Sequence, residues 1–351
     1  MLLVSSYPPR HCGIGAYARH QVERLRADGH EVTVLSPPDG DGDIHEPFPG
    51  GGAFRRAARI GGAFDRIVVH FQPALYSATR RPVAKIVTSA SLLWLVARRR
   101  RATELMLHET DAPVWWRPDY LLLWMAFAAA RRLSFHTQAE RAAFEREYRL
   151  RPGGRASVVP HPGGPSIEPG AIGRAEARSR LGVAAAARPL FLCLGFVQPS
   201  KGFDRALEAF ARVFGSGEDA ARDGSGAAAA LYLVGSVRED TAENLAYATR
   251  LWARAREVPG ARAIDRWLSD EEFDLWIAAA DRVVLPYRRS WSSGVLARAH
   301  ELGTPAIVMD VGGLSEQAGR DDIVVSGDDE LADALGRLAR EAAARATGAT
   351  S

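Results

Sequence analysis

The chain has 351 residues, a formal net charge of +3 and 47% hydrophobic residues, which is enough for two domains of ordinary size. It shows no zinc-ligand spacing, RNP-like aromatic run or basic recognition helix, so nucleic acid is not an indicated partner. Its two cysteines, Cys12 and Cys193, are too few and too far apart for a disulfide framework or a metal cluster, so we expect a reducing cytoplasm and no metal site.

In the first half of the chain, short apolar runs alternate with helical segments, a pattern typical of parallel sheets covered by helices. A helix is predicted from Tyr17 to Asp28, because Gly29 supplies a residue that commonly ends helices. The stretch from Asp39 to Gly52 is rich in Gly, Asp and Pro and is predicted to be a mobile surface loop. The predicted strands are 2–7, 31–36, 66–71, 104–109, 132–137 and 157–161.

A segment dense in Pro and Gly, 160–170, has no apolar period, so an interdomain linker is predicted there. We expect an N-terminal domain at 1–162, a C-terminal domain at 163–330 and a C-terminal helix or tail at 331–351. A second loop is predicted at 215–226. The strand pattern restarts after the linker, at 189–196, 229–237, 261–267, 282–287, 306–310 and 322–327. The sequence therefore predicts an α/β protein with two Rossmann-like domains, whose parallel sheets face each other across a cleft.

A glycine-rich segment follows the first predicted strand. Gly13 and Gly15 fit the loose pattern G-x-G-x-x-A, in which small residues let backbone N–H groups at a helix start approach a phosphate. A dinucleotide site would place the first glycine directly after the strand, whereas Pro8 to Cys12 intervene here, so NAD is not favoured. The two glycines are candidates for phosphate binding, and ordinary turn glycines are the alternative.

His108 ends a predicted strand, where an imidazole can hydrogen-bond a sugar hydroxyl or move a proton. The chain has nine histidines, and His70 also ends a predicted strand. A structural histidine is the alternative interpretation.

Lys201 lies in a loop after a predicted strand, where its ammonium can meet a leaving diphosphate. Only two of the 45 Lys and Arg residues are lysines, Lys85 and Lys201, so a lysine at this place is informative. A solvated surface lysine is the alternative.

The segment 283–316 contains two apolar strand candidates with a helix between them. Ser292 or Ser293 can cap that helix, which begins at Gly294 and Val295. Its free N–H groups then face the carboxyl edge of the sheet, which favours an anion such as a diphosphate. An ordinary capped helix is the alternative.

This segment resembles the donor-site segment of the GT-B glycosyltransferases of family 4. A Pro-ended strand, a small-residue loop and a helix are followed by Gly303-Thr304-Pro305, a further strand, and Gly-Gly-x-x-Glu at 312–316. In that family a similar glycine-rich loop after a Pro-Pro-Arg stretch lies against the donor phosphates, and a histidine ends the strand next to the transferred sugar. The resemblance thus selects His108 ahead of His136 and His161, with His70 as the runner-up. It implies catalytic roles for His108 and Lys201. It implies donor or phosphate binding by Gly13, Gly15, Lys201, Ser292, Ser293, Gly294 and Val295.

The chain departs from the family pattern at three positions. The family's donor segment carries two glutamates eight positions apart, and here these positions hold Ser290 and Arg298. A family arginine in the loop of Lys201 is replaced by Phe196, so half of the diphosphate clamp is missing. Glu301 is then a candidate for the ribose, and Arg298 for a phosphate or a sugar carboxylate. A solvated Glu301 is the alternative.

The resemblance implies a retaining, metal-independent transferase without a cofactor. It would move a sugar from a nucleotide-diphosphate sugar to a glycan or lipid-linked acceptor, in bacterial cell-envelope or polysaccharide biosynthesis. The lost carboxylates and Phe196 favour one alternative, a catalytically silent GT-B subunit that partners an active enzyme. A nucleotide-sugar epimerase is disfavoured, because no cluster of carboxylates and histidines suited to elimination is visible.

Two apolar segments, 83–101 and 120–132, end in arginines. With Lys85, Thr88 and Ser89 inside, the first is a poor membrane span, and a buried helix is the commoner interpretation. Tryptophans near the arginines also suit a protein that rests on an anionic membrane face. The tryptophans are at 94, 115, 116 and 124. We expect a cytoplasmic protein, with peripheral attachment to the inner face of the plasma membrane as a further expectation.

Overall fold

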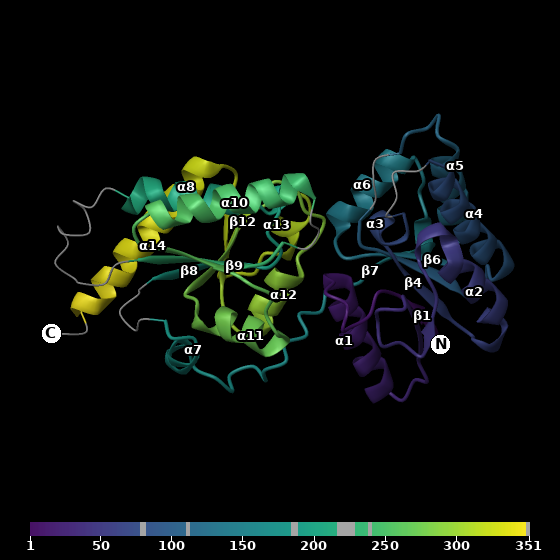
Figure 1. The fold of residues 1–351 in the computed structure, drawn as a ribbon, viewed down its shortest axis with the longest axis horizontal. Coiled ribbons are helices and arrows are strands. Elements are labelled where there is room, and N and C mark those ends of the chain that lie inside the picture. The colour runs from purple at the N-terminus through teal and green to yellow at the C-terminus, as the bar shows by residue number, and fades with distance from the viewer. Residues whose placement is uncertain (78–81, 110–112, 184–188, 216–228, 238–240, 349–351) are drawn as a thin grey trace. The chain divides into compact units, whose positions relative to one another are not determined.

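The computed structural model describes residues 1–77, 82–109, 113–183, 189–215, 229–237 and 241–348, with only the backbone of 346–348. The chain divides into two compact units, Met1–His161 and Pro162–Ser351 (Figure 1). This division lies one residue before the end of the expected N-terminal domain. The loop predicted at 215–226 lies outside the described residues beyond Gly215.

Unit 1 contains one parallel sheet with the strand order β3-β2-β1-β4-β5-β6-β7. Its strand β3 lies inside the stretch predicted to be a mobile loop, and Phe48 of the same stretch is buried in the core. The loop prediction was therefore wrong for part of 39–52. The strands are β1 (Leu2–Val4), β2 (Thr33–Ser36), β3 (Ile44–His45), β4 (Ile67–Phe71), β5 (Thr103–Leu107), β6 (Arg132–Phe135) and β7 (Ala156–Val158).

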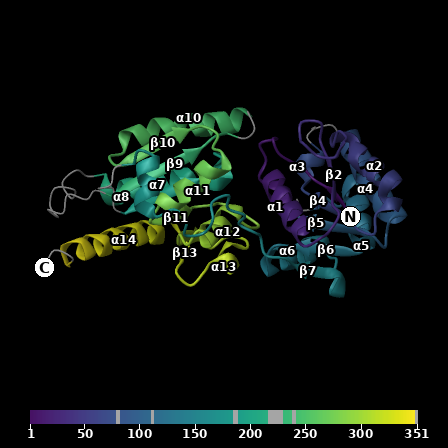
Figure 2. The same ribbon diagram turned by 90° about the horizontal axis from the view of Figure 1, so that it is seen from below.

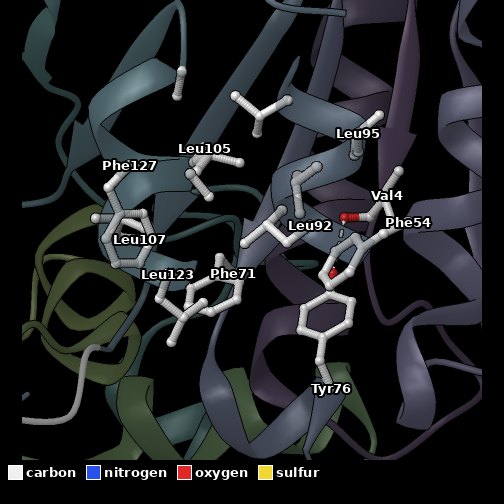
Figure 3. Packing of buried hydrophobic residues seen from close by; sticks show 14 of the residues in the cluster. Val4, Phe54, Phe71, Tyr76, Leu92, Leu95, Leu105, Leu107, Leu123 and Phe127 are labelled. Carbon is white, nitrogen blue, oxygen red and sulfur yellow. Dashed lines mark hydrogen bonds between the residues drawn. The ribbon is translucent and has the colours of Figure 1, made fainter. Parts of the chain in front are cut away.

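Helices cover both faces of this sheet because successive strand residues point to opposite sides. Leu3 of β1 packs with Ala18 and Val22 of α1 on one face. Leu2 and Val4 belong to the larger core on the other face, where Figure 3 shows side chains of α2, α4 and α5 meeting β4 and β5. The helices are α1 (Gly13–Ala27), α2 (Gly52–Ile60), α3 (Pro73–Tyr76), α4 (Pro82–Arg98), α5 (Pro118–Ala129) and α6 (Gln138–Tyr148).

Unit 2 repeats this plan with a parallel sheet of order β10-β9-β8-β11-β12-β13. Figures 1 and 2 show α8, α10 and α14 on one face of the sheet and α7, α11 and α12 on the other. The predicted fold class, α/β with two Rossmann-like parallel sheets, is confirmed. The strands are β8 (Leu190–Leu194), β9 (Ala230–Gly235), β10 (Ala261–Asp265), β11 (Arg282–Leu285), β12 (Ala306–Met309) and β13 (Ile323–Val325). The helices are α7 (Arg174–Arg180), α8 (Phe203–Phe214), α10 (Ala242–Glu257), α11 (Asp270–Ala279), α12 (Gly294–Glu301), α13 (Leu314–Gln317) and α14 (Asp328–Gly348).

The C-terminal helix α14 is an integral part of unit 2. Leu331 and Leu335 are fully buried in the unit's core. Arg205 and Arg212 of α8 pair with the carboxylates of Asp328 and Asp329 at the start of α14, each at 2.6 Å. The helix therefore closes the core rather than forming a separate tail.

In each sheet the strand order reverses at one place. The reversal lies between β1 and β4 in unit 1, and between β8 and β11 in unit 2. In open parallel sheets, ligands bind beyond the carboxyl ends of the strands at such a reversal, because the loops on its two sides leave in opposite directions. The loops after these four strands are therefore the places to look for a site.

The segment after the unit boundary is fastened to unit 2 by two carboxylates. Asp274, fully buried on α11, accepts hydrogen bonds from the N–H groups of Ser166 and Ile167, at 2.6 and 3.0 Å. Glu301 on α12 accepts from the N–H groups of Gly163 and Gly164, at 2.8 and 3.0 Å. The second half of the predicted linker is thus held as part of unit 2.

Removal of the Asp274 carboxylate tests this anchoring. Asp274→Ala removes one of the two carboxylates that bind the buried guanidinium of Arg298, and it leaves two backbone N–H groups without their acceptor, so we expect a loss of about 3–5 kcal/mol in the stability of unit 2. Calorimetric unfolding of the full chain would measure it. The double variant Asp274→Ala/Arg298→Met should recover part of the loss, and Glu176→Ala on the surface of α7 should change stability by less than about 0.5 kcal/mol. A small effect of Asp274→Ala would contradict the prediction.

Candidate active site

Two loops meet at the reversal between β8 and β11. The backbone N–H of Arg288 donates to the carbonyl of Ser200 at 2.9 Å, and the guanidinium of Arg288 binds both carboxylate oxygens of Asp204, at 2.6 and 2.8 Å. Burial raises the pKa of Asp204, but the hydrogen bonds from Arg288 and Tyr247 outweigh this effect, so the pKa is lowered. The loop after β8 and the loop after β11 therefore form one connected surface.

Lys201 ends the short 3-10 helix 199–201 on this surface. Its Nζ lies 3.9 Å from the centre of the Tyr287 ring, a cation–π distance, and Tyr287 is fully buried. Gly202 has φ +64°, and a Cβ there would lie 2.1 Å from the carbonyl oxygen of Pro286, so only glycine lets the two loops approach so closely. Within the described part of the chain no carboxylate pairs with Lys201. Its charge is thus available to an anion.

The helix α12 begins beside the same loops. Of the two serines predicted as its cap, Ser293 fills that place, since its hydroxyl accepts a hydrogen bond from the N–H of Leu296 at 3.3 Å. Val295 lies close to the loop after β8, because its Cγ2 is 3.8 Å from where a Cβ on Gly195 would stand. A side-chain cation and a helix start therefore lie at one edge of the unit 2 sheet, which suits the binding of an anion.

Four histidines gather at the carboxyl edge of the unit 1 sheet. His70 lies on β4, His108 directly follows β5, His136 directly follows β6, and His161 comes shortly after β7. The ring of Tyr17 on α1 contacts all four imidazoles edge-on, with centroid distances of 5.1, 5.0, 5.3 and 5.0 Å in that order. Neighbouring parallel strands thus bring together residues that are up to 91 positions apart, since 161 − 70 = 91.

Hydrogen bonds hold the imidazoles in place. His70 Nδ1 lies 3.0 Å from the hydroxyl of Ser5, at the end of β1, and His70 Nε2 lies 2.8 Å from Oε1 of Gln21. His136 Nδ1 faces the carbonyl of Val159 at 3.0 Å, and its Nε2 lies 3.3 Å from His108 Nδ1. The cluster therefore contains two hydrogen-bonded groups, one around His70 and one around His108 and His136, and the ring of Tyr17 contacts both.

Burial governs the protonation of this cluster. Burial lowers the pKa of His70 to about 3 and that of His136 to about 4, and it lowers the pKa of His108 well below the ordinary value. The other imidazoles act in the same direction on His108. Burial also raises the pKa of the Tyr17 hydroxyl. At neutral pH these three histidines are consequently uncharged.

Comparison with known proteins connects both edges to one family. A model of the glycosyl transferases of group 1 matches residues 188–341, and a model of glycosyltransferase family 4 matches residues 12–162. The chain belongs to the GT-B glycosyltransferases of the family 4 type. No curated protein matches it in sequence.

Solved structures share the fold of this glycosyltransferase over nearly its whole length. Sucrose-phosphate synthase from Thermosynechococcus elongatus is 17% identical with a TM-score of 0.70, covering 99% of this chain and 94% of that one. HepE from Anabaena, solved in complex with UDP-glucose, is 16% identical with a TM-score of 0.68 and the same two coverages. A trehalose 6-phosphate synthase from Burkholderia multivorans is 14% identical with a TM-score of 0.64, covering 99% and 93%. At these identities the likeness concerns the fold.

The glycosyltransferase uses Arg298 and Glu301 differently from what its sequence indicated. Arg298 is buried, binds the carboxylates of Asp270 and Asp274, and lies 5.0 Å over the ring of Phe273. Glu301 is exposed, as the alternative interpretation had it, and its carboxylate binds the backbone after the unit boundary. Both side chains are thus bonded to other groups of unit 2, and their roles toward a ligand stay predictions.

The remaining candidates lie at the two sheet edges. Gly13 is exposed in the first turn of α1, and Gly15 is buried, with Ser6 and the backbone of Tyr7 each 3.4 Å from where its Cβ would stand. Ser292 and Gly294 are partly exposed at the start of α12. At the family arginine position, the ring of Phe196 packs 5.8 Å from that of Trp267. Roles of these residues toward a ligand stay predictions.

Two elements of the candidate site were missed from sequence. Tyr17 was taken only as a helix residue, and the histidines were treated as competing candidates rather than as one cluster. The available signal was that each histidine follows an apolar run and that sequential strands of such sheets are usually neighbours. Nothing in the sequence pattern marks Tyr287 as the ring under Lys201.

The histidine cluster should make unit 1 sensitive to acid. Because these imidazoles titrate near 6.5 when unfolded but only near 3 to 4 when folded, stability is complete above about pH 6.5 and falls as the pH drops, by about 1.4 kcal/mol per pH unit for each histidine. Thermal unfolding between pH 7.5 and 4.5 would show it. His70→Gln should flatten the pH dependence, whereas His30→Gln, on the surface, should not. Equal slopes for all three proteins would contradict the prediction.

Proposed function

We propose that this glycosyltransferase takes a nucleotide-diphosphate sugar as its donor and transfers the sugar with retention of configuration, without a metal ion. The observation that carries the proposal is that Lys201 and the start of α12 both lie after the strands that border the reversal between β8 and β11. The same class of donor is bound by HepE, which was solved with UDP-glucose and with UDP.

The chemistry follows from where negative charge develops. When the bond between the anomeric carbon and the diphosphate breaks, its electrons pass to the leaving phosphate oxygen. The ammonium of Lys201 and the N–H groups at Gly294 and Val295 would stabilise that charge, because both stand at the same edge of the sheet. The proposal therefore assigns to Lys201 and a helix dipole the neutralising role that other transferases give to a metal ion.

Retention of configuration without a covalent intermediate is consistent with a site that has no carboxylate where the family carries the first glutamate of its donor segment. That position holds Ser290, whose hydroxyl donates to the carbonyl of Ser292 at 2.9 Å. In the proposed reaction the leaving phosphate takes the proton of the incoming hydroxyl on the face it has just left. The sugar then keeps its configuration, and the reaction needs no glycosyl-enzyme intermediate.

A donor screen with a matched lysine pair tests the proposal. UDP-, GDP-, ADP- and TDP-sugars are added to the protein in EDTA, and we expect one of them to raise its melting temperature and to be hydrolysed slowly. Lys201→Ala should lower kcat/KM by about 10²- to 10³-fold, which corresponds to about 2.7–4 kcal/mol of lost charge stabilisation. Lys85→Ala removes the other lysine of the chain, on α4 of unit 1, and should leave donor hydrolysis unchanged.

A catalytically silent subunit remains the second candidate. It is favoured by one observation, the aromatic contact between Phe196 and Trp267 where the family has a diphosphate-binding arginine. If no nucleotide sugar stabilises the protein, or if Lys201→Ala and Lys85→Ala behave alike, the active-transferase proposal is wrong. The silent subunit would then explain the fold.

For the acceptor, we propose a glycan or lipid-linked molecule met at an anionic membrane surface. Apolar side chains stand exposed on α4 and α5, which pack together: Val83 is 71% exposed, Leu121 53% and Met125 43%. Trp116, just before α5, is 86% exposed. Arg98 lies 6.0 Å over the ring of exposed Trp94, so cations border this apolar face. Trp124, in contrast, donates to the carbonyl of Tyr148 inside the unit.

The exposed apolar face of α4 and α5 supports a protein that rests on a membrane and does not cross it. In the part of the chain that the structure describes, no helix is long and apolar enough to be a membrane span. Exposed tryptophan and leucine beside arginine suit the interface of an anionic bilayer, where the rings and the cations each find their preferred partner.

Vesicle flotation tests the membrane surface with matched leucines. We expect the protein to float with vesicles that contain phosphatidylglycerol, to float less with pure phosphatidylcholine, and to be released by salt. Leu121→Ser should weaken binding by about tenfold or more, because a buried leucine contributes about 1.5–3 kcal/mol. Leu245→Ser, at a leucine of unit 2 that is 45% exposed, should not weaken it. Equal binding to both vesicle types would contradict the proposed anionic membrane surface.

A further inference from the structure

A chain of hydrogen bonds fixes the protons within the histidine cluster. The carbonyl oxygen of Val159 lies 3.0 Å from Nδ1 of His136 and only accepts, so this nitrogen carries a proton. In an uncharged His136 the other nitrogen, Nε2, is then an acceptor. It lies 3.3 Å from Nδ1 of His108, so the proton of that second bond belongs to His108. His108 is left with a lone pair on Nε2.

The surroundings keep these rings uncharged. The groups that face His108 are the imidazoles of His70, His136 and His161 and the ring of Tyr17, and each of the imidazoles opposes protonation of His108. The carboxylate of Glu140 reaches the backbone N–H of His136, at 2.5 Å. The order of protons along the chain therefore follows from geometry and burial together.

The lone pair at the end of this chain is an acceptor without a donor. Among the described residues, Nε2 of His108 is buried and makes no hydrogen bond. The residue as a whole is partly exposed, so His108 borders the surface of unit 1. A buried acceptor that lacks a donor is unfavourable, and a ligand that donates to it relieves this cost.

We infer that His136 is a positioning residue, which holds His108 in the tautomer with its proton on Nδ1 so that Nε2 accepts a hydrogen bond from a substrate hydroxyl. The ligand class is an uncharged O–H donor, on a sugar or on an acceptor. A phosphate is disfavoured, because its oxygens and the lone pair of His108 repel one another. The hydroxyl step, in which a substrate hydroxyl donates to Nε2 of His108, rests on the proposed transferase reaction. The tautomer of His108 does not depend on that reaction.

Nitrogen NMR on the full chain decides the tautomer without any substrate. In protein labelled with ¹⁵N-histidine, long-range correlations distinguish a protonated from an unprotonated ring nitrogen, and His108→Asn and His136→Asn variants assign the two rings. We expect both rings to carry the proton on Nδ1 at pH 7. A proton on Nε2 of His108 in the wild-type protein would overturn the inference, whatever the variants do.

Two substitutions at His136 separate positioning from mere packing. His136→Gln offers an amide oxygen as the acceptor for His108, so His108 should keep its proton on Nδ1. His136→Leu fills similar space without an acceptor, so a share of His108 should move its proton to Nε2. If His108 shows the same tautomer in both variants, His136 does not set it. Circular dichroism and melting temperature establish that both variants are folded, and the wild-type spectrum decides if either is not.

Kinetics test the hydroxyl step separately. With a turned-over donor, His136→Leu should raise the KM for the hydroxyl-bearing substrate about tenfold or more with a smaller change in kcat, and His136→Gln should restore it. Because His108 is an uncharged acceptor, KM should stay level from pH 8 to 5.5. A KM that falls as the pH drops below 6.5 would instead show an imidazolium that binds phosphate, and would overturn the inference. Absence of any turnover together with the expected tautomer would refute the proposed transferase and leave the positioning of His108 intact.

Discussion

Parallel strand pairing is the constraint on which both candidate sites depend. In a parallel sheet every strand delivers its next residue to the same edge, so polar residues that follow buried strands collect there without any sequence proximity. In unit 1 this brings four histidines from β4 to β7 against Tyr17. In unit 2 it brings the loop of Lys201 beside the loop of Tyr287, because β8 and β11 are neighbours. At the reversal of strand order, the loops on its two sides leave in opposite directions, so each sheet has one place where a ligand can bind between them.

The same constraint explains what could be predicted from the sequence. Most strands are buried and appear in the sequence as continuous apolar runs, and each predicted strand is present, including the more exposed β7 and β10. Strand β3 was not predicted because it has only two residues in a Gly- and Pro-rich stretch. Local motifs also gave Ser293 as a cap and Lys201 as a loop cation, since capping and strand ends are decided within a few residues. The positions of Arg298 and Glu301 were not predictable, because their partners lie 24 to 138 residues away along the chain.

Arg298 stands where the family has a glutamate, and neighbouring carboxylates compensate the charge of its guanidinium. A buried guanidinium is tolerated only when carboxylates and carbonyls compensate its charge, and here Asp270 and Asp274 of α11 do so. Asp274 also accepts two backbone N–H groups from the segment after the unit boundary. A glutamate at position 298 would face those same carboxylates and be repelled. The residue at this position has therefore become part of the internal framework of unit 2.

The two sheet edges differ in charge in a way that suits the proposed reaction. The edge of unit 2 presents a lysine and a helix start, which in the proposed reaction would stabilise the anion that grows as the donor bond breaks. The edge of unit 1 presents imidazoles that burial keeps uncharged, which suit hydroxyl groups and avoid competing for the diphosphate. If the histidines were charged, both edges would attract phosphate, and the donor would have two competing places to bind. In the proposed reaction, burial of the histidines around Tyr17 would thus leave the edge of unit 2 as the place where the diphosphate binds.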